Sequence, residues 1–164
     1  MYMLSKALRI ASLAVALATA GIVPAVAATT IDVQLWDKGA SVEMMLNMGK
    51  TMMPMDMQMA PMGITVSTAT VPAGEVIFAV TNISKEVIHE MVLSPLASAD
   101  AVLPYDEANS KVDEDAAGHL GEVAELDPGT SGSLTLTLEP GLYILFCNIA
   151  GHFTSGMWTL ITVK

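Results

Sequence analysis

Short runs in which apolar and polar residues alternate occupy most of the chain from Thr30 onward. One run spans Thr30–Trp36, and turn-forming residues such as Pro72–Gly74 and Asp127–Gly129 separate most of the later runs. The later runs are Ile64–Val71, Glu75–Thr81, Val87–Ser94, Glu122–Leu126, Ser133–Leu138, Leu142–Cys147 and Met157–Val163. Period-two alternation bounded by turns predicts strands, and this number of short strands predicts an all-β fold. We therefore expect an antiparallel β-sandwich of seven to eight strands.

The longest interval between predicted strands, Pro95 to Gly121, lacks strand periodicity and is rich in Ala, Asp and Glu. It could hold a short helix or an extended loop between the two sheets. The chain has no internal repeat and no sign of a second domain. We expect residues 28–63 to supply the first strand and a methionine-rich segment, and residues 64–164 to form the rest of the same domain.

The first 27 residues have the organisation of a cleavable export signal. Lys6 and Arg9 precede an apolar stretch, Ile10–Val23, and Ala25–Ala27 forms a small-residue cleavage site. The apolar stretch is too short and too interrupted by polar residues to predict a membrane span. We expect a periplasmic or otherwise exported protein of 137 residues with no stable membrane insertion.

The charge of the chain limits its partners. Its formal net charge is −10, which becomes about −12 once Lys6 and Arg9 leave with the signal peptide. Nucleic acid is excluded as a partner, because phosphate binding needs a basic face. Many carboxylates fall between Asp100 and Asp127, where a solvated surface is the favoured interpretation and a docking patch for a basic redox partner or copper donor the weaker one. We expect a monomer.

Cys147 is the single cysteine of the chain, and His152 and Met157 follow it closely. A lone cysteine is often a buried apolar residue, and it cannot form a disulfide within its own chain. A thiolate, an imidazole and a thioether within eleven residues instead favour a soft metal site. With a second imidazole, this donor set suits copper in an electron-transfer centre.

The second imidazole has two candidates. His89 lies in the apolar strand Val87–Ser94, where the default interpretation is a hydrogen-bonded core histidine. His119 lies in the acidic interval, where a surface residue is expected. We favour His89 because strands hold ligands more rigidly than loops do. The predicted ligands are therefore His89, Cys147, His152 and Met157.

Strand geometry places the cysteine. Tyr143, Leu145 and Cys147 share one face of the strand that ends at Cys147, and its other face is also apolar, as a central strand requires. Gly151 and Gly156 each precede a predicted ligand and allow tight turns there.

Nine methionines fall between Met44 and Met62. They could be adaptable core residues, since Val42, Met45 and Leu46 have helical spacing. That explanation suits Met53–Met59 poorly, because Pro54 and Pro61 break helices and alternate thioethers would line one side of an extended segment. Thioethers favour Cu(I), so the segment could bind copper. An exposed docking patch is a third possibility.

The sequence resembles the cupredoxins, the type 1 or blue copper proteins. The resemblance rests on Val80–Asn82 leading to His89, and on Pro140–Cys147 followed by Gly151-His152 and Gly156-Met157. It covers residues 64–163 and implies a Greek-key β-sandwich that binds one copper ion through His89, Cys147 and His152, with Met157 axial. It also implies that the His152 edge reaches the surface among Ala150 and Phe153, as the electron exit.

Two functions follow, and neither is enzymatic, because four protein ligands leave no open position for a substrate. The first is electron transfer to exported redox partners through the copper ion. The second is copper tolerance or handling, in which the methionine-rich segment helps to bind or buffer Cu(I). A metal-free structural sandwich is the least favoured interpretation.

Overall fold

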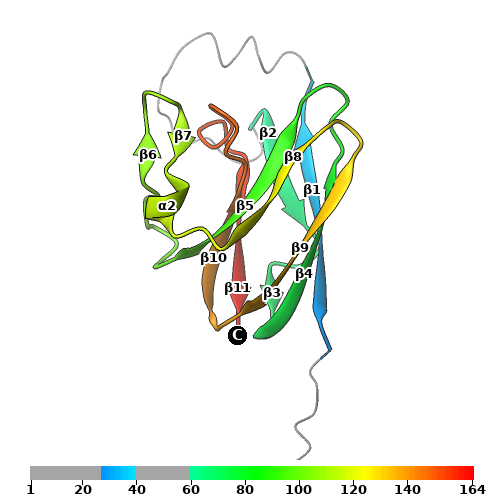
Figure 1. Ribbon diagram of the computed structural model, residues 1–164, viewed down its shortest axis with the longest axis vertical. Helices are drawn as coiled ribbons and strands as arrows, with labels where there is room; N and C mark the ends of the chain where they lie inside the picture. The colour runs from blue at the N-terminus through cyan, green and yellow to red at the C-terminus, as the bar shows by residue number, and fades with distance from the viewer. Residues whose placement is uncertain (1–26, 40–59) are drawn as a thin grey trace, which may run out of the picture.

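The structure is a computed structural model that describes residues 27–39 and 60–164, and in these residues two β-sheets pack face to face (Figure 1). The first sheet has, in spatial order, β2 (Met62–Val66), β1 (Thr29–Asp37), β4 (Gly74–Asn82) and β9 (Ser131–Leu138). The second has β3 (Thr70–Val71), β11 (Trp158–Val163), β10 (Gly141–Phe146), β5 (His89–Leu96) and β8 (Gly121–Leu126). The predicted all-β sandwich is confirmed.

The chain changes sheets repeatedly. It passes from the first sheet to the second between β4 and β5, returns between β8 and β9, and crosses again between β9 and β10. Most neighbours are antiparallel, but β1 pairs with β4 and β3 pairs with β11 in parallel. These crossings bring β5 and β10, which lie far apart in sequence, side by side in the second sheet.

The predicted run Ile64–Val71 is divided between the two sheets. β2 ends at Val66 in the first sheet, and β3 begins at Thr70 in the second. At the corner, the backbone N–H of Asp32 donates to the hydroxyl of Ser67, while the backbone N–H of Ser67 donates to the carbonyl of Asp32. These bonds continue the contact with β1 by one position beyond Val66. The described residues contain eight strands of five or more residues, in agreement with the expected seven to eight.

The interval between β5 and β8 contains a short helix, which was one of the two structures expected from the sequence. It forms the short strands β6 (Tyr105–Asp106) and β7 (Lys111–Val112), followed by the one-turn helix α2 (Glu114–Ala117). Asp113 caps this helix by accepting from the N–H of Ala116, and Gly118 ends it in a left-handed conformation. Figure 1 shows these elements outside the sandwich, beside β5 and β10. We call residues 97–120 the excursion.

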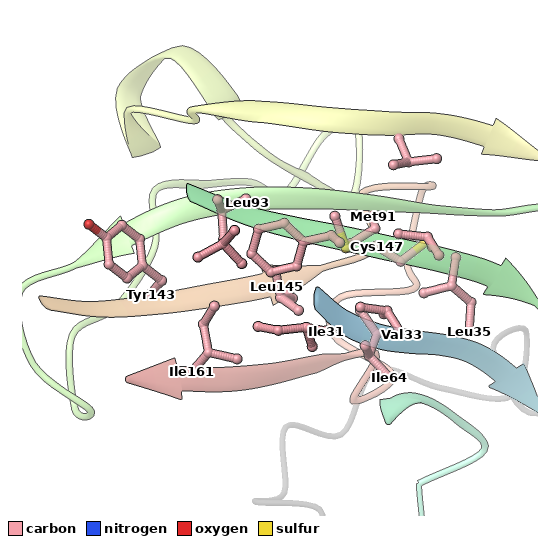
Figure 2. Packing of buried hydrophobic residues seen from close by; sticks show 14 of the residues in the cluster. Ile31, Val33, Leu35, Ile64, Met91, Leu93, Tyr143, Leu145, Cys147 and Ile161 are labelled. Atoms are coloured by element: carbon pink, nitrogen blue, oxygen red, sulfur yellow. The ribbon is translucent and has the colours of Figure 1, made fainter. Parts of the chain in front are cut away.

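The main core lies between the sheets. Ile31, Val33 and Leu35 alternate inward from β1, and they share the main core with Leu145 of β10 and with Cys147, which follows β10. All five side chains are wholly or almost wholly buried. Figure 2 shows Tyr143, Leu145 and Cys147 in one row along β10, as predicted from strand alternation. Cys147 thus directly follows a strand whose inward side chains are buried in the main core.

A second, smaller core lies on the outer face of the second sheet. Val92, Ile144 and Phe146 point away from the sandwich and pack with Leu103 and Val112 of the excursion. This packing explains why both faces of β10 are apolar. The excursion therefore covers a face of the sheet rather than bridging the two sheets.

Two sequence predictions lie outside the described residues. These are the signal peptide, of which only Ala27 is described, and most of the segment from Met44 to Met62. Within residues 27–39 and 60–164, no helix is long and apolar enough to cross a membrane.

Replacing Leu145 by alanine tests the packing of the main core. Leu145 has no exposed surface, so the substitution should lower the free energy of unfolding of the metal-free protein by about 2–5 kcal/mol. Leu120→Ala is the matched control, because Leu120 is 44% exposed, and it should change that free energy by less than about 0.5 kcal/mol. Urea unfolding measures both values, and equal losses would contradict the described core.

Candidate metal centre

Three of the predicted ligands converge at one end of the sandwich. The Nδ1 atoms of His89 and His152 are 3.3 Å apart, and the Sγ of Cys147 lies 3.3 Å from the His152 Nδ1. One donor atom from each residue lies within 4.8 Å of the others. His89 and Cys147 have no exposed surface, and His152 retains 6%.

Different elements supply these side chains. His89 is the first residue of β5, and Cys147 directly follows β10. Because β5 and β10 pair in register, with Val92 opposite Phe146, the starting end of β5 meets the finishing end of β10. Sheet pairing thus brings together two residues that are 58 positions apart in the sequence.

The ligand loop, residues 147–157, folds back on itself. The N–H of Cys147 donates to the carbonyl of Met157, and the N–H of Met157 donates to the carbonyl of His152. Gly151 and Gly156 have φ angles of +82° and +92°, the left-handed conformation expected from their positions before His152 and Met157. The loop returns to β11 with His152 directed at Cys147.

The orientation of His89 is set by a carboxylate. Its Nε2 lies 3.2 Å from the Oδ2 of Asp37, and the side chain of Asp37 is only 2% exposed. Burial raises the pKa of Asp37, but hydrogen bonds from Ser84, Gly39 and His89 outweigh burial and lower it below its ordinary value. An ionised carboxylate only accepts, so the N–H of a neutral His89 ring is at Nε2 and the lone pair at Nδ1.

The protein holds the metal-free donors neutral. Burial raises the pKa of the Cys147 thiol to about 12, although the N–H groups of Glu90 and Ile149 oppose this shift. Burial, and then the nearby His89, lowers the pKa of His152 to about 4. Burial also lowers the pKa of His89, against the opposing effect of Asp37. At neutral pH both imidazoles have a free lone pair, and only the thiol has a proton to lose.

The donor set fits copper. Two ligands about 2.1 Å from one ion lie roughly 3.4 Å apart at a tetrahedral angle, close to the 3.3 Å spacings of these donor atoms. Two imidazole nitrogens and a thiolate form the equatorial set of copper electron-transfer sites. The backbone N–H of Glu90 lies 3.5 Å from the sulfur and would stabilise it as a thiolate.

Met157 is the fourth predicted ligand. It is wholly buried, and its backbone bonds to both Cys147 and His152 place it beside them. Its sulfur is a weak, soft donor of the kind found at the axial position of such sites.

The excursion braces the ligand loop. The side chain of Asn148 accepts from the N–H of Val112 and donates to the carbonyl of the same residue. It also donates to Glu114 of α2. The N–H of Gly151 donates to the carbonyl of Ser110, which has a positive φ of 54°. The residue next to Cys147 and the residue next to His152 are thus both tied to the excursion.

Phe153 of the ligand loop also contacts the excursion, through Tyr105. Its ring centroid is 5.8 Å from that of Phe146 and 6.1 Å from that of Tyr105. Figure 1 shows the loop between β10 and β11 at the same end of the sandwich as the hairpin of β6 and β7.

His119 does not join the cluster. It follows the cap of α2 and is exposed, as expected for a surface residue. Among the residues that the structure describes, His89, Cys147 and His152 form the single group of three or more such side chains close enough to hold a metal ion.

Sequence reasoning missed Asp37, Asn148 and the buried Glu90. Burial raises the pKa of Glu90 to about 7, with Glu125 and other carboxylates adding to the shift and Lys111 opposing it. A carboxylate at the end of the first predicted strand was the available signal for Asp37. Nothing in the local pattern connected it to His89.

Comparisons with known proteins identify the family of the chain and solved structures with a similar fold. A family model described as copper binding proteins, plastocyanin/azurin family, matches residues 51–164, which include all four predicted ligands. Rusticyanin from Thiobacillus ferrooxidans is 18% identical, with a TM-score of 0.54 over 84% of this chain and 77% of its own. Auracyanin B is 23% identical, with a TM-score of 0.52 over 88% of this chain and 95% of its own. No curated protein sequence gives a significant match.

Metal binding to the metal-free protein should release about one proton per ion at pH 7. The thiol, with its pKa raised to about 12, must lose its proton, whereas both imidazoles are already neutral. Calorimetry in two buffers of different ionisation enthalpy, with Zn²⁺ as a redox-inert probe, measures this number. Apparent affinity should rise about tenfold per pH unit between pH 7 and 8. Release of no proton, or of two, would contradict the assigned protonation states.

Proposed function

The chain belongs to the plastocyanin/azurin family of copper-binding proteins, and from this premise we propose that it transfers electrons through one type 1 copper site. His89, Cys147 and His152 hold the ion in this proposal, and Met157 is the axial donor. The observation that carries it is the convergence of three buried, neutral donor atoms at one end of a cupredoxin sandwich. Copper, when bound, supplies a one-electron couple.

The protein residues keep the donors in place. A backbone hydrogen bond joins Cys147, directly after β10, to Met157, directly before β11. The carboxylate of Asp37 orients the ring of His89. Because the donors are fixed by neighbouring strands, they rearrange little when the charge of the ion changes. Small rearrangement favours rapid transfer, and a site closed by four protein donors does not offer a position to substrate, so we propose a carrier rather than an enzyme.

His152 is the proposed exit for the electron. It retains 6% exposure, whereas His89 and Cys147 have none, and its neighbours Ala150 and Phe153 are exposed and partly exposed. A partner that contacts this end would approach the site most closely through the His152 ring. The acidic composition of the chain favours a partner with a basic surface.

The proposed location is outside the cytoplasm. Lys6, Arg9 and the apolar residues after them have the pattern of an export signal that ends near Ala27. A diffusible monomer without its first 27 residues would then carry electrons between exported redox proteins.

The Cys147→Ser variant tests the electron-transfer proposal. It should abolish the intense visible absorption that a copper–thiolate bond gives, because serine does not supply a soft thiolate. The visible spectrum of the copper-loaded protein measures this loss. His119→Ala is the control and should leave the spectrum unchanged, since His119 is exposed and outside the cluster. Full absorption in Cys147→Ser would refute the proposed site.

Copper handling is the second candidate function, and the attachment of the methionine-rich segment favours it. On one side of that segment, Gly39 donates to Asp37, which contacts His89. On the other side, a Cβ at Gly156 in the ligand loop would lie only 3.0 Å from that of Ala60. The described residues that flank the methionine-rich segment, Gly39 and Ala60, therefore both lie near residues of the metal centre, and thioethers are soft donors that favour Cu(I).

A Cu(I) titration separates the two candidates. In copper handling, the wild-type protein should bind more than one Cu(I), and replacing Met52, Met53, Met55, Met57 and Met59 by leucine should remove the additional binding. The Cys147→Ser protein is the matched control, because it should lose the main site and keep the additional binding. A competition assay with a chromophoric Cu(I) chelator measures each stoichiometry. One equivalent in both the wild type and the leucine variant would leave only the electron carrier.

A further inference from the structure

The imidazole ring of His89 lies between His152, on its Nδ1 side, and the carboxylate of Asp37, on its Nε2 side. Its Nδ1 faces the His152 Nδ1 at 3.3 Å, and its Nε2 faces the Asp37 Oδ2 at 3.2 Å. Both side chains of the His89–Asp37 pair are almost fully buried, so water does not compete for this bond. A neutral imidazole has one N–H and one lone pair, and the carboxylate can use only the N–H.

The carboxylate of Asp37 is itself held rigidly. Its Oδ1 accepts from the N–H of Gly39 at 2.6 Å, and the hydroxyl of Ser84 also donates to it. Asp37 ends β1, where it pairs with Met62 of β2, and Gly39 has a φ of +88° that turns its N–H back toward the carboxylate. The charge behind His89 therefore has a fixed position.

The segment that carries Ser84 is fixed as well. The side chain of Asn82 accepts from the N–H of Ser84 and donates to the carbonyls of Val87 and Leu126. These bonds link the end of β4 to the loop before β5 and to β8. The loop before His89 is thus tied through Asn82 to two strands, and both Ser84 of this loop and His89 at the start of β5 approach Asp37.

We propose that Asp37 is a positioning residue of the copper site: it fixes His89 as the Nε2–H tautomer with Nδ1 toward the metal, and its charge favours Cu(II) over Cu(I). This inference rests on the proposed copper site and assigns a role to a residue from the opposite sheet. The tautomer follows from the hydrogen bond. The preference for Cu(II) follows from Coulomb's law, because a fixed negative charge stabilises the more positive ion more strongly.

The Asp37→Asn variant removes the charge and nearly preserves the shape. Asp32→Asn is the matched control, because Asp32 lies on the same strand with an exposed side chain. Nitrogen-15 NMR of the metal-free proteins reports the tautomer of His89. Wild type and Asp32→Asn should show Nε2–H alone, and Asp37→Asn should show a mixture, because an amide can present either a donor or an acceptor to the ring.

Copper binding gives the second readout. Asp37→Asn should weaken Cu(II) binding by about 10- to 100-fold, as loss of a group that orients a metal-binding histidine does. Cu(I) binding should weaken less. A tenfold difference between the two losses raises the reduction potential by about 59 mV. Asp32→Asn should remain within twofold of the wild type for both ions.

The results that would overturn the inference are specific. A wild-type His89 with its proton on Nδ1, or a potential in Asp37→Asn that equals the Asp32→Asn value or falls below it, would each do so. If Asp37→Asn does not fold, Ser84→Ala replaces it, since loss of the Ser84 bond should change the potential in the same direction by a smaller amount. The tautomer is measured without metal, so a wild-type protein that lacks a copper–thiolate band would refute the proposed function and leave this measurement intact.

Discussion

The structure depends on one constraint: three donor atoms with lone pairs, from His89, Cys147 and His152, are buried together at one end of a β-sandwich. Such groups are costly to bury unless they find partners, and here the donors face one another. His89 begins β5, and the loop that carries Cys147 and His152 is attached at both ends to the packed strands β10 and β11. A soft cation at their centre would satisfy all three donors together. When no metal is bound, burial keeps the His152 imidazole neutral and the thiol protonated.

Support for the donors comes from both sides of the sandwich. Asp37, from the first sheet, orients the ring of His89. On the opposite side, the excursion packs on the outer face of the second sheet and holds the ligand loop through Asn148 and the carbonyl of Ser110. The acidic interval for which the sequence allowed a short helix or an extended loop thus provides a second core and holds the ligand loop in place. Its carboxylates can remain in water while its apolar residues face Phe146 and Ile144.

Sequence reasoning reached the sandwich from local alternation, and it reached three of the donors from their chemistry and from a choice between two other histidines. Alternation predicted the inward row on β10, and the softness of a lone thiol beside an imidazole indicated the metal. It did not reach the division of Ile64–Val71 between the two sheets, at whose corner Ser67 contacts Asp32 of β1, 35 residues away. It also missed Asp37 and Asn148, whose partners lie 52 and 36 residues away and meet only through strand register.

X-ray absorption spectroscopy at the copper edge of the Cu(II)-loaded protein tests the central claim most directly. The account predicts two nitrogen neighbours and one short sulfur neighbour around a single copper ion, from His89, His152 and Cys147. A first shell that contains only nitrogen and oxygen would mean that Cys147 does not bind the ion, and it would contradict the account.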